Sequence, residues 1–106
     1  MTAAALAPLA EQPAADPEYV LRLFVSGFTP RSQRAIGNLR HICERYLAGR
    51  YRVEVIDLYK SPWLAHGEQI VATPTLLRLL PLPRQRIIGD LSQVDKVLHA
   101  LDLLGG

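Results

Sequence analysis

Cysteine is nearly absent from this sequence, and so is any long hydrophobic run. The 106 residues include one cysteine, Cys43. A single cysteine excludes an internal disulfide, a Cys-x-x-Cys redox pair and a metal site built from several thiolates. The apolar stretch at residues 76–80 is broken by Arg78 and followed by Pro81, so nothing approaches the roughly 18–20 apolar residues that span a bilayer. We therefore expect a protein of a reducing compartment that has no contact with the membrane.

Positive charge is missing from the N-terminal segment. Residues 1–17 are rich in alanine and proline and contain no lysine or arginine, which predicts a flexible leader and argues against a secretory signal. We expect a cytoplasmic protein. All twelve basic residues follow position 18, where only seven acidic residues accompany them. This balance favours either an acidic protein partner or an ordinary solvated basic face. The basic residues form no dense run and no nucleic-acid-binding motif, so we expect no nucleic-acid partner.

Motifs for metal or nucleotide binding are also lacking. The three histidines, His41, His66 and His99, lie in different segments and have no ligand spacing. The sequence contains neither a GxxxxGK[ST] loop nor a GxGxxG loop. These observations predict no metal and no cofactor.

The remaining chain, residues 18–106, reads as one α/β domain, since 49% of the sequence is hydrophobic. Periodicity and turn residues predict a strand at 19–25, a helix at 30–47 that Thr29 and Pro30 begin, and a strand at 51–58 near a sheet edge. A short helix at 63–71 follows Ser61 and Pro62, and the segment at 75–80 is either a strand or a buried helix. A strand at 84–88 precedes a last helix that Ser92 caps, with Asp95 in its first turn and an apolar stripe that ends at Leu104.

This order of elements, βαβαββα, resembles the thioredoxin fold, with Thr73–Pro74 where that fold keeps a cis-proline loop. A thioredoxin-type enzyme needs a thiolate at the start of its first helix, and residues 27–31 contain no cysteine. Cys43 falls on the apolar stripe of that helix, so we expect an inert, packed thiol, with a thiol enzyme as the alternative. We expect Trp63 to be a packing anchor; an exposed Trp63 would be an interface hot spot.

Four segments carry a more specific resemblance. They are YVLRLFVSGFTPRS, YRVEVIDLYKSP, IVATPTLLRLLPLPRQRIIGDLS and DKVLHALDLL, and they occur in this order over nearly the whole domain. Together they resemble the KaiB family of small circadian-clock proteins.

The resemblance implies a non-enzymatic regulator. Members of the family bind the N-terminal ring of the hexameric ATPase KaiC, capture KaiA and displace the kinase SasA. The resemblance also implies a metamorphic domain with two folds. The thioredoxin-like monomer, βαβαββα, binds KaiC, and an oligomeric ground state, βαββααβ, is a dimer or tetramer. We expect the ground state to be the majority form.

The resemblance also assigns roles to individual residues. Basic residues that match family positions linked to partner contacts or assembly are Arg22, Arg34, Arg78 and Arg86. Arg52 and Glu54 join them, because they lie on the strand that the family uses at partner interfaces. The hinges of the fold switch would be Pro74, Pro81, Pro83, Gly89 and Asp90.

Some residues depart from the family pattern. Glu54 and Gln69 stand where clock members usually have lysine, and Gln85 stands where they usually have arginine. Charge reversal on a contact strand predicts a changed choice of partner. Two alternatives to a circadian KaiB therefore stay open: a divergent paralogue that serves another KaiC in stress adaptation, and a sensor module of the SasA type.

Overall fold

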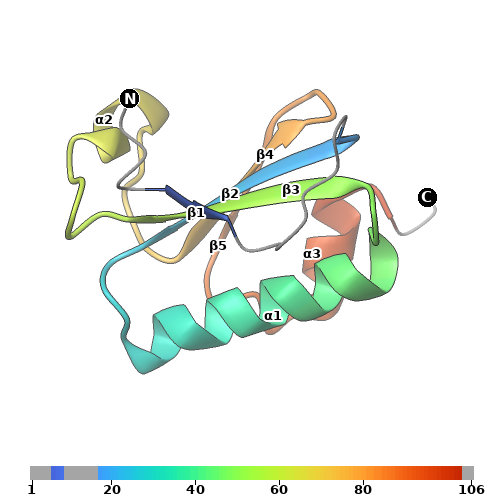
Figure 1. Ribbon diagram of the computed structural model, residues 1–106, viewed down its shortest axis with the longest axis horizontal. Coiled ribbons are helices and arrows are strands. Elements are labelled where there is room, and N and C mark those ends of the chain that lie inside the picture. The colour runs from blue at the N-terminus through green and yellow to red at the C-terminus, as the bar shows by residue number, and fades with distance from the viewer. Residues whose placement is uncertain (1–5, 9–16, 104–106) are drawn as a thin grey trace.

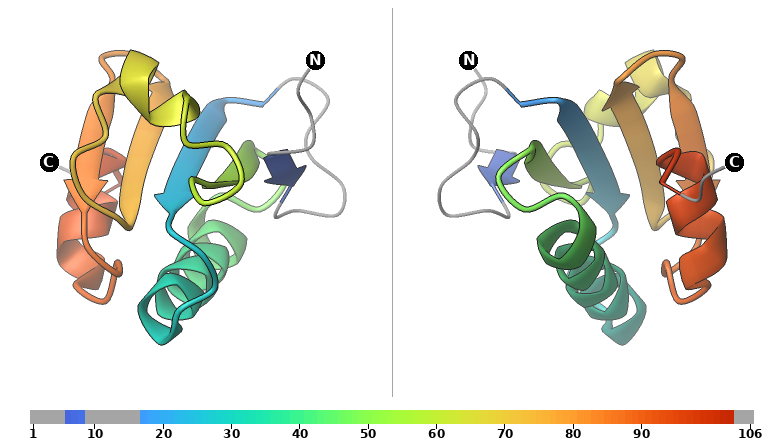
Figure 2. Two further views of the ribbon diagram at one scale, coloured as in Figure 1. Left: turned by 90° about the vertical axis from the view of Figure 1, so that its left-hand side faces the viewer. Right: turned by 90° about the vertical axis from the view of Figure 1, so that its right-hand side faces the viewer.

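The computed structural model describes residues 6–8 and 17–103. These residues form a five-stranded sheet of order β1-β3-β2-β4-β5 (Figure 1). Helices α1 and α3 cover one face of the sheet, and α2 lies against the other face (Figure 2). The elements are β1 (Leu6–Pro8), β2 (Tyr19–Val25), α1 (Pro30–Tyr46), β3 (Tyr51–Asp57), α2 (Leu64–Glu68), β4 (Thr75–Leu80), β5 (Gln85–Ile88) and α3 (Val94–Ala100). After β1, the elements follow the thioredoxin-like order βαβαββα. The expectation that an oligomeric ground state is the majority form stays a prediction.

Strand β2 is the centre of the sheet, as its nearly unbroken apolar run predicted. It pairs with β3 in parallel and with β4 in antiparallel register. Every residue of β2 is buried except Arg22, which is partly exposed. Leu21, Leu23 and Val25 face the helices, and Phe24 packs on the α2 side with Ile56 and Leu77. A strand that is covered on both faces needs apolar residues at consecutive positions.

Helix α1 begins where the sequence predicted and ends one residue earlier. The Thr29 hydroxyl accepts a hydrogen bond from the Ser32 amide at 3.1 Å, and Pro30 occupies the first turn. The Thr29 hydroxyl pairs with one of the amide groups that a helix N-terminus leaves without a partner, and Pro30 has no amide hydrogen that would need one. Ala35, Leu39, Ile42 and Cys43 form the buried stripe of the helix.

The ambiguous segment at residues 75–80 is strand β4, which forms a hairpin with β5. β4 lies between two other strands, so its apolar run reflects burial of a strand and not of a helix. The peptide bonds before Pro74, Pro81 and Pro83 are all cis, and Pro74 is the one that the sequence led us to expect.

Helix α3 corrects the predicted cap. Ser92 does not cap it; the Ser92 amide donates to the Asp90 carboxylate at 3.1 Å, and Leu91 adopts a positive φ of 66°. The helix starts after Gln93 without a side-chain cap. It ends at Ala100, because Asp102 adopts a left-handed conformation at φ 63°. The predicted end was Leu104, which lies outside the described residues. Val97, Leu98 and Leu101 form its buried stripe.

Helix α2 is shorter than the predicted helix at 63–71. Gln69 adopts a left-handed conformation with φ 56°, and its amide bonds back to carbonyls of the last turn. That geometry ends a helix. Ser61 and Pro62 form the turn before α2, and no side chain caps the helix.

Strand β1 is an element that the sequence did not predict. It pairs antiparallel with β3, with Leu6 opposite Ile56 and Pro8 opposite Glu54. β3 is therefore one strand in from the edge of the sheet. The leader was predicted to be flexible over residues 1–17, and most of it, residues 1–5 and 9–16, lies outside the described residues. Within the described ranges, no helix is long and apolar enough to cross a membrane.

Candidate interaction site on the α2 side of the sheet

The loop that would hold a thioredoxin-type redox centre carries no thiol. It connects β2 to α1 at residues 26–29, and its amide at Gly27 donates to the Asp57 carboxylate at 2.9 Å. Cys43, the sole cysteine, is fully buried in the core beneath α1. Burial, with a smaller contribution from the Glu44 charge, raises the pKa of its thiol to about 12. Burial keeps this thiol protonated and inaccessible, which opposes a nucleophilic role, so the thiol-enzyme alternative gains no support from the position of Cys43. Among residues 17–103, no cluster of three His, Cys, Asp or Glu side chains could hold a metal.

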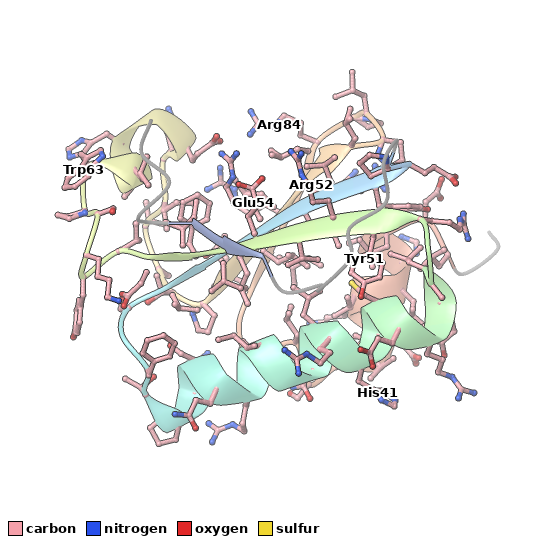
Figure 3. The ribbon with its side chains drawn as sticks, viewed as in Figure 1. His41, Tyr51, Arg52, Glu54, Trp63 and Arg84 are labelled. Carbon is pink, nitrogen blue, oxygen red and sulfur yellow. The ribbon has the colours of Figure 1, made fainter. Side chains whose placement is uncertain are left out.

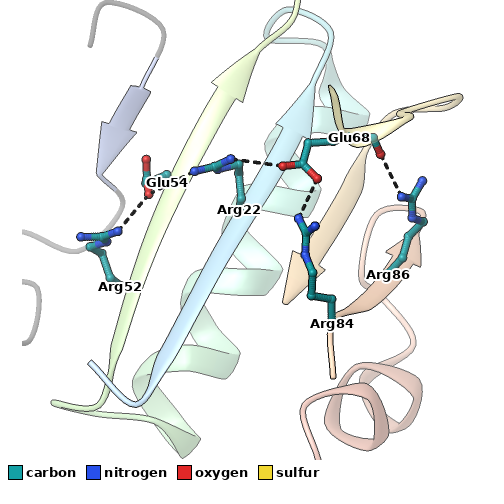
Figure 4. A network of polar contacts seen from close by, with 6 residues as sticks. All are labelled: Arg22, Arg52, Glu54, Glu68, Arg84 and Arg86. Carbon is teal, nitrogen blue, oxygen red and sulfur yellow. Dashed lines mark hydrogen bonds and ion pairs between the residues drawn. The ribbon is translucent and has the colours of Figure 1, made fainter. Parts of the chain in front are cut away.

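A row of charged side chains crosses the sheet on the α2 side. Glu54 on β3 is in register with Arg22 on β2, Arg22 with Leu77 on β4, and Leu77 with Arg86 on β5. Arg22 lies 3.9 Å from the Glu54 carboxylate, and Arg52 lies 3.5 Å from the same oxygen (Figure 4). Strand alternation puts these residues on one face because they sit opposite one another in the pairing.

Glu68, the last residue of α2, contacts this row from the helix that lies over the same face of the sheet. One of its carboxylate oxygens lies 2.6 Å from the Arg84 guanidinium, and the other lies 3.6 Å from Arg22 (Figure 4). Arg86 donates to the main-chain carbonyls of Glu68 at 2.9 Å and Gln69 at 2.8 Å. We call this set the charged face: Arg22, Arg52, Glu54, Glu68, Arg84 and Arg86.

The charged face has an excess of positive charge. The guanidinium groups of Arg22, Arg52 and Arg84 share two carboxylates, and each carboxylate is contacted by two of them. A fourth guanidinium, that of Arg86, bonds to main-chain carbonyls instead. Glu54 and Glu68 are mostly covered, with side chains 14% and 22% exposed, whereas Arg52 and Arg84 are about half exposed. The Nε group of Arg22 is buried without a hydrogen-bond partner. The face therefore presents cationic donors to solvent, which suits a partner with carboxylates.

Arg34 and Arg78, which the resemblance grouped with these residues, lie elsewhere. Arg78 is buried, and its guanidinium donates to the carbonyls of Ala100 at 2.8 Å and Pro83 at 2.7 Å. It thereby joins the β4–β5 turn to α3. Arg34 lies on α1, 3.4 Å from the Asp90 carboxylate. The hydrogen bonds from Ser92, and then Arg34, lower the pKa of Asp90 below its usual value.

Sequence reasoning missed two members of the charged face and misjudged one aromatic residue. Glu68 and Arg84 join the face only because α2 folds back over β2, and the spacing of residues along the chain holds no signal of that contact. Trp63 is 63% exposed, so the prediction of a packing anchor is wrong. It precedes helix α2, which has no buried residue.

The fold defines a thioredoxin-like domain whose β2–α1 loop carries no cysteine. Among solved structures, the chain is similar to the N-terminal domain of SasA from Synechococcus elongatus, with a TM-score of 0.68, 27% identity, and coverage of 92% of this chain and 94% of that domain. The germline thioredoxin Deadhead of Drosophila melanogaster shares the fold, with a TM-score of 0.67 at 18% identity over 85% of this chain and 84% of that one.

The KaiB domain family matches residues 22–103. A circadian clock oscillator protein KaiB from Prochlorococcus marinus is 55% identical over 81% of this chain and 80% of its own length. The protein of the same description from Synechococcus elongatus is 53% identical over 83% of this chain and 86% of its own. The chain belongs to the KaiB family.

Proposed function

We propose that this chain is a non-enzymatic regulator that binds a KaiC-type hexameric ATPase and modulates its phosphorylation cycle, as a component of a circadian clock in the cytoplasm. The observation that carries the proposal is identity above 50% with clock oscillator proteins over more than four fifths of the chain. The protonated, buried Cys43 thiol is consistent with a role in binding and not in redox catalysis.

The charged face is the surface that we assign to partner or assembly contacts. It unites Arg22, Arg52, Glu54 and Arg86, which the family resemblance selected, with Glu68 and Arg84. Its exposed guanidinium groups suit an acidic surface on the ATPase, on KaiA or on a second copy of the chain. Arg34 remains a separate contact residue on α1, and Arg78 takes a structural role, because its guanidinium is held by two main-chain carbonyls.

The described fold supports the binding-competent monomer in this scheme. Binding by the monomer alone would reduce the apparent affinity in proportion to its population, since an oligomeric ground state would compete with the partner. The switch would refold residues 75–103 about Pro74, Pro81, Pro83, Gly89 and Asp90, and leave the β2–α1–β3 unit intact.

A SasA-type sensor module is the second candidate, because the SasA domain matches this fold over nearly all of both chains. Such a module would bind the same ATPase but would not switch folds or form the ground-state oligomer. A KaiB paralogue that serves a different KaiC is the third, because Glu54 places a carboxylate between Arg22 and Arg52 on the contact strand.

The deciding experiment is size-exclusion chromatography of the chain alone and with each KaiC-type ATPase of its organism in the presence of ATP. Elution as an oligomer that converts to a complex with one ATPase supports the regulator and identifies its pathway. A monomer that binds at once supports the SasA-type module. Absence of a complex with every KaiC-type ATPase would refute the proposed function.

Two variants test the switch itself, and the family resemblance predicts that Gly89→Ala and Asp90→Arg favour the thioredoxin-like monomer. The geometry of this form opposes both changes. Gly89 has φ 125°, which strains any residue with a side chain, and Asp90→Arg sets a second arginine against Arg34. The variants will therefore raise the monomer population only if the alternative arrangement loses more stability than this one.

A further inference from the structure

Large apolar side chains lie exposed at the end of the sheet where β2 and β3 finish. Phe28 is 63% exposed, Tyr59 is 76% exposed, Trp63 is 63% exposed and Val71 is 84% exposed. We call these four residues the aromatic end surface. Figure 3 shows Trp63 beyond the ends of the strands, apart from Arg52 and Glu54 of the charged face. Exposed apolar residues that gather in one place mark interaction sites more often than residues scattered singly.

Hydrogen bonds hold the loops of this surface together. Asp57 accepts from the Gly27 amide and from the Tyr59 amide, each at 2.9 Å, and thereby ties the β2–α1 loop to the β3–α2 loop. The ring of Tyr59 packs on Gly27, where an added Cβ would lie 2.9 Å from the ring. The hydroxyl groups of Ser26 and Thr73 are 2.9 Å apart and connect the loop before β4. The aromatic rings therefore project from a fixed base, so docking would not have to order the loops first.

The topology of the sheet brings these loops to one end. β2 and β3 run parallel, so the loops that leave their carboxyl ends lie at the same end of the sheet. β4 runs antiparallel to β2, so the loop that enters β4 lies at this end as well.

Two exposed cationic residues neighbour this surface along the chain. Lys60 is exposed between Tyr59 and Trp63 in the chain, and Arg31 is exposed in the first turn of α1, which holds no acidic residue. The nearby carboxylate, Asp57, is held by the two amides described above. The partner surface that complements this arrangement is apolar at its centre and carries carboxylates at its rim.

We propose that the aromatic end surface docks such an apolar, carboxylate-rimmed patch on the KaiC-type ATPase. This inference rests on the proposed function for its partner, and it adds a contact distinct from the charged face. Tyrosine and tryptophan are enriched among the residues that dominate binding energy at interfaces, so Tyr59 and Trp63 are the expected hot spots.

Trp63 supplies its own reporter, because it is the only tryptophan in the chain. In ¹⁵N-labelled protein its indole N–H gives a single signal, which we expect to shift or broaden when unlabelled ATPase and ATP are added. Trp63→Ala and Tyr59→Ala should each weaken the Kd for the ATPase at least tenfold. Lys60→Glu should weaken it as well, and more at low salt than at high salt.

Leu82→Ala is the matched control, because Leu82 is 70% exposed and lies in the β4–β5 turn at the opposite end of β4. Circular dichroism melts of all variants check that each one folds. If wild type binds the ATPase while the indole signal stays unchanged and both aromatic variants bind like Leu82→Ala, the inference is overturned and the proposed function stands. If wild type binds no KaiC-type ATPase, the proposed function fails and this inference fails with it.

Discussion

The hydroxyl of Tyr19, at the start of β2, donates a buried hydrogen bond to the carbonyl of Leu101, just after α3, at 3.0 Å. The two residues are 82 positions apart, and the bond joins the first strand of the core to its last helix. A rearrangement of the C-terminal half would have to break it.

Tyr19→Phe removes this donor and leaves the Leu101 carbonyl buried without its partner. We expect the free energy of unfolding to fall by about 1 kcal/mol. Urea denaturation followed by circular dichroism measures the change. Tyr46→Phe is the control, because Tyr46 lies at the end of α1 and is 37% exposed. Equal stability of the two variants would mean that the Tyr19 bond contributes nothing.

Glu54→Lys replaces the carboxylate that Arg22 and Arg52 share. Three cations would then adjoin one another, so the free energy of unfolding should fall by about 1 kcal/mol, and less at high salt. The affinity for an acidic partner should rise, because the net charge of the charged face becomes more positive by two units. Titration calorimetry against the KaiC-type ATPase measures the affinity, with Glu54→Gln as the intermediate case. An affinity that falls in the order wild type, Gln, Lys would contradict the assignment of this face.

The buried thiol of Cys43 predicts a loss of stability in alkali. Its pKa is about 12 in the folded chain and 9.0 as the ordinary value. The folded state therefore keeps a proton that the unfolded chain releases above pH 9. Stability is complete below pH 9 and falls as the pH rises toward 12, by at most about 1.4 kcal/mol per pH unit.

Cys43→Ala should flatten this alkaline decline in urea melts at pH 8, 9 and 10. In the wild type, Ellman's reagent should label the thiol only once urea unfolds the chain. Fast labelling of the native protein at pH 8 would show that the thiol is accessible. Burial, and then the Cys43 thiolate, raises the pKa of Tyr51, which adds a decline of the same sign; in the variant the part caused by burial remains and the part caused by Cys43 is lost.

The Asp90 carboxylate predicts the opposite dependence in acid. Hydrogen bonds from Ser92, followed by Arg34, lower its pKa below the ordinary value of 3.8. Its contribution to stability is present above pH 3.8 and is lost as the pH falls through the lowered pKa. A ¹³C-NMR titration of the carboxyl should locate that pKa. Arg34→Gln should raise the pKa only partly, because the hydrogen bonds from Ser92 contribute more to the lowering than Arg34 does. An unshifted pKa in the wild type would contradict this geometry.

Local signals explain what could be predicted from the sequence. The apolar run of β2, the Thr29–Pro30 start of α1 and the hydrophobic stripe that holds Cys43 depend on neighbours within a turn or a strand. The structure confirmed all three. The thioredoxin-like order of elements followed from them, since short connections leave few topologies.

The features that could not be predicted depend on contacts between distant segments or on unusual backbone conformations. Arg22 and Glu68 are 46 positions apart, and only the placement of α2 over β2 brings them together. The positive φ of Leu91 moved the start of α3 beyond Ser92, and no residue preference signals such a conformation in a leucine. The burial of Arg78, whose guanidinium bonds to two main-chain carbonyls, is a further such feature, because sequence alone does not distinguish a buried arginine from an exposed one.

The pairing of β2 with β4 has a consequence for the dynamics of the native state. At this strand pair, the β4–β5 hairpin and α3 join the β2–α1–β3 unit. Within that unit, β2 is paired with β3 along its whole length. Local opening between β2 and β4 exposes Leu76 and the α3 stripe but leaves the parallel pair intact. Amide protons of β4, β5 and α3 should therefore exchange with solvent sooner than those of β2 and β3, in two cooperative steps and not in one.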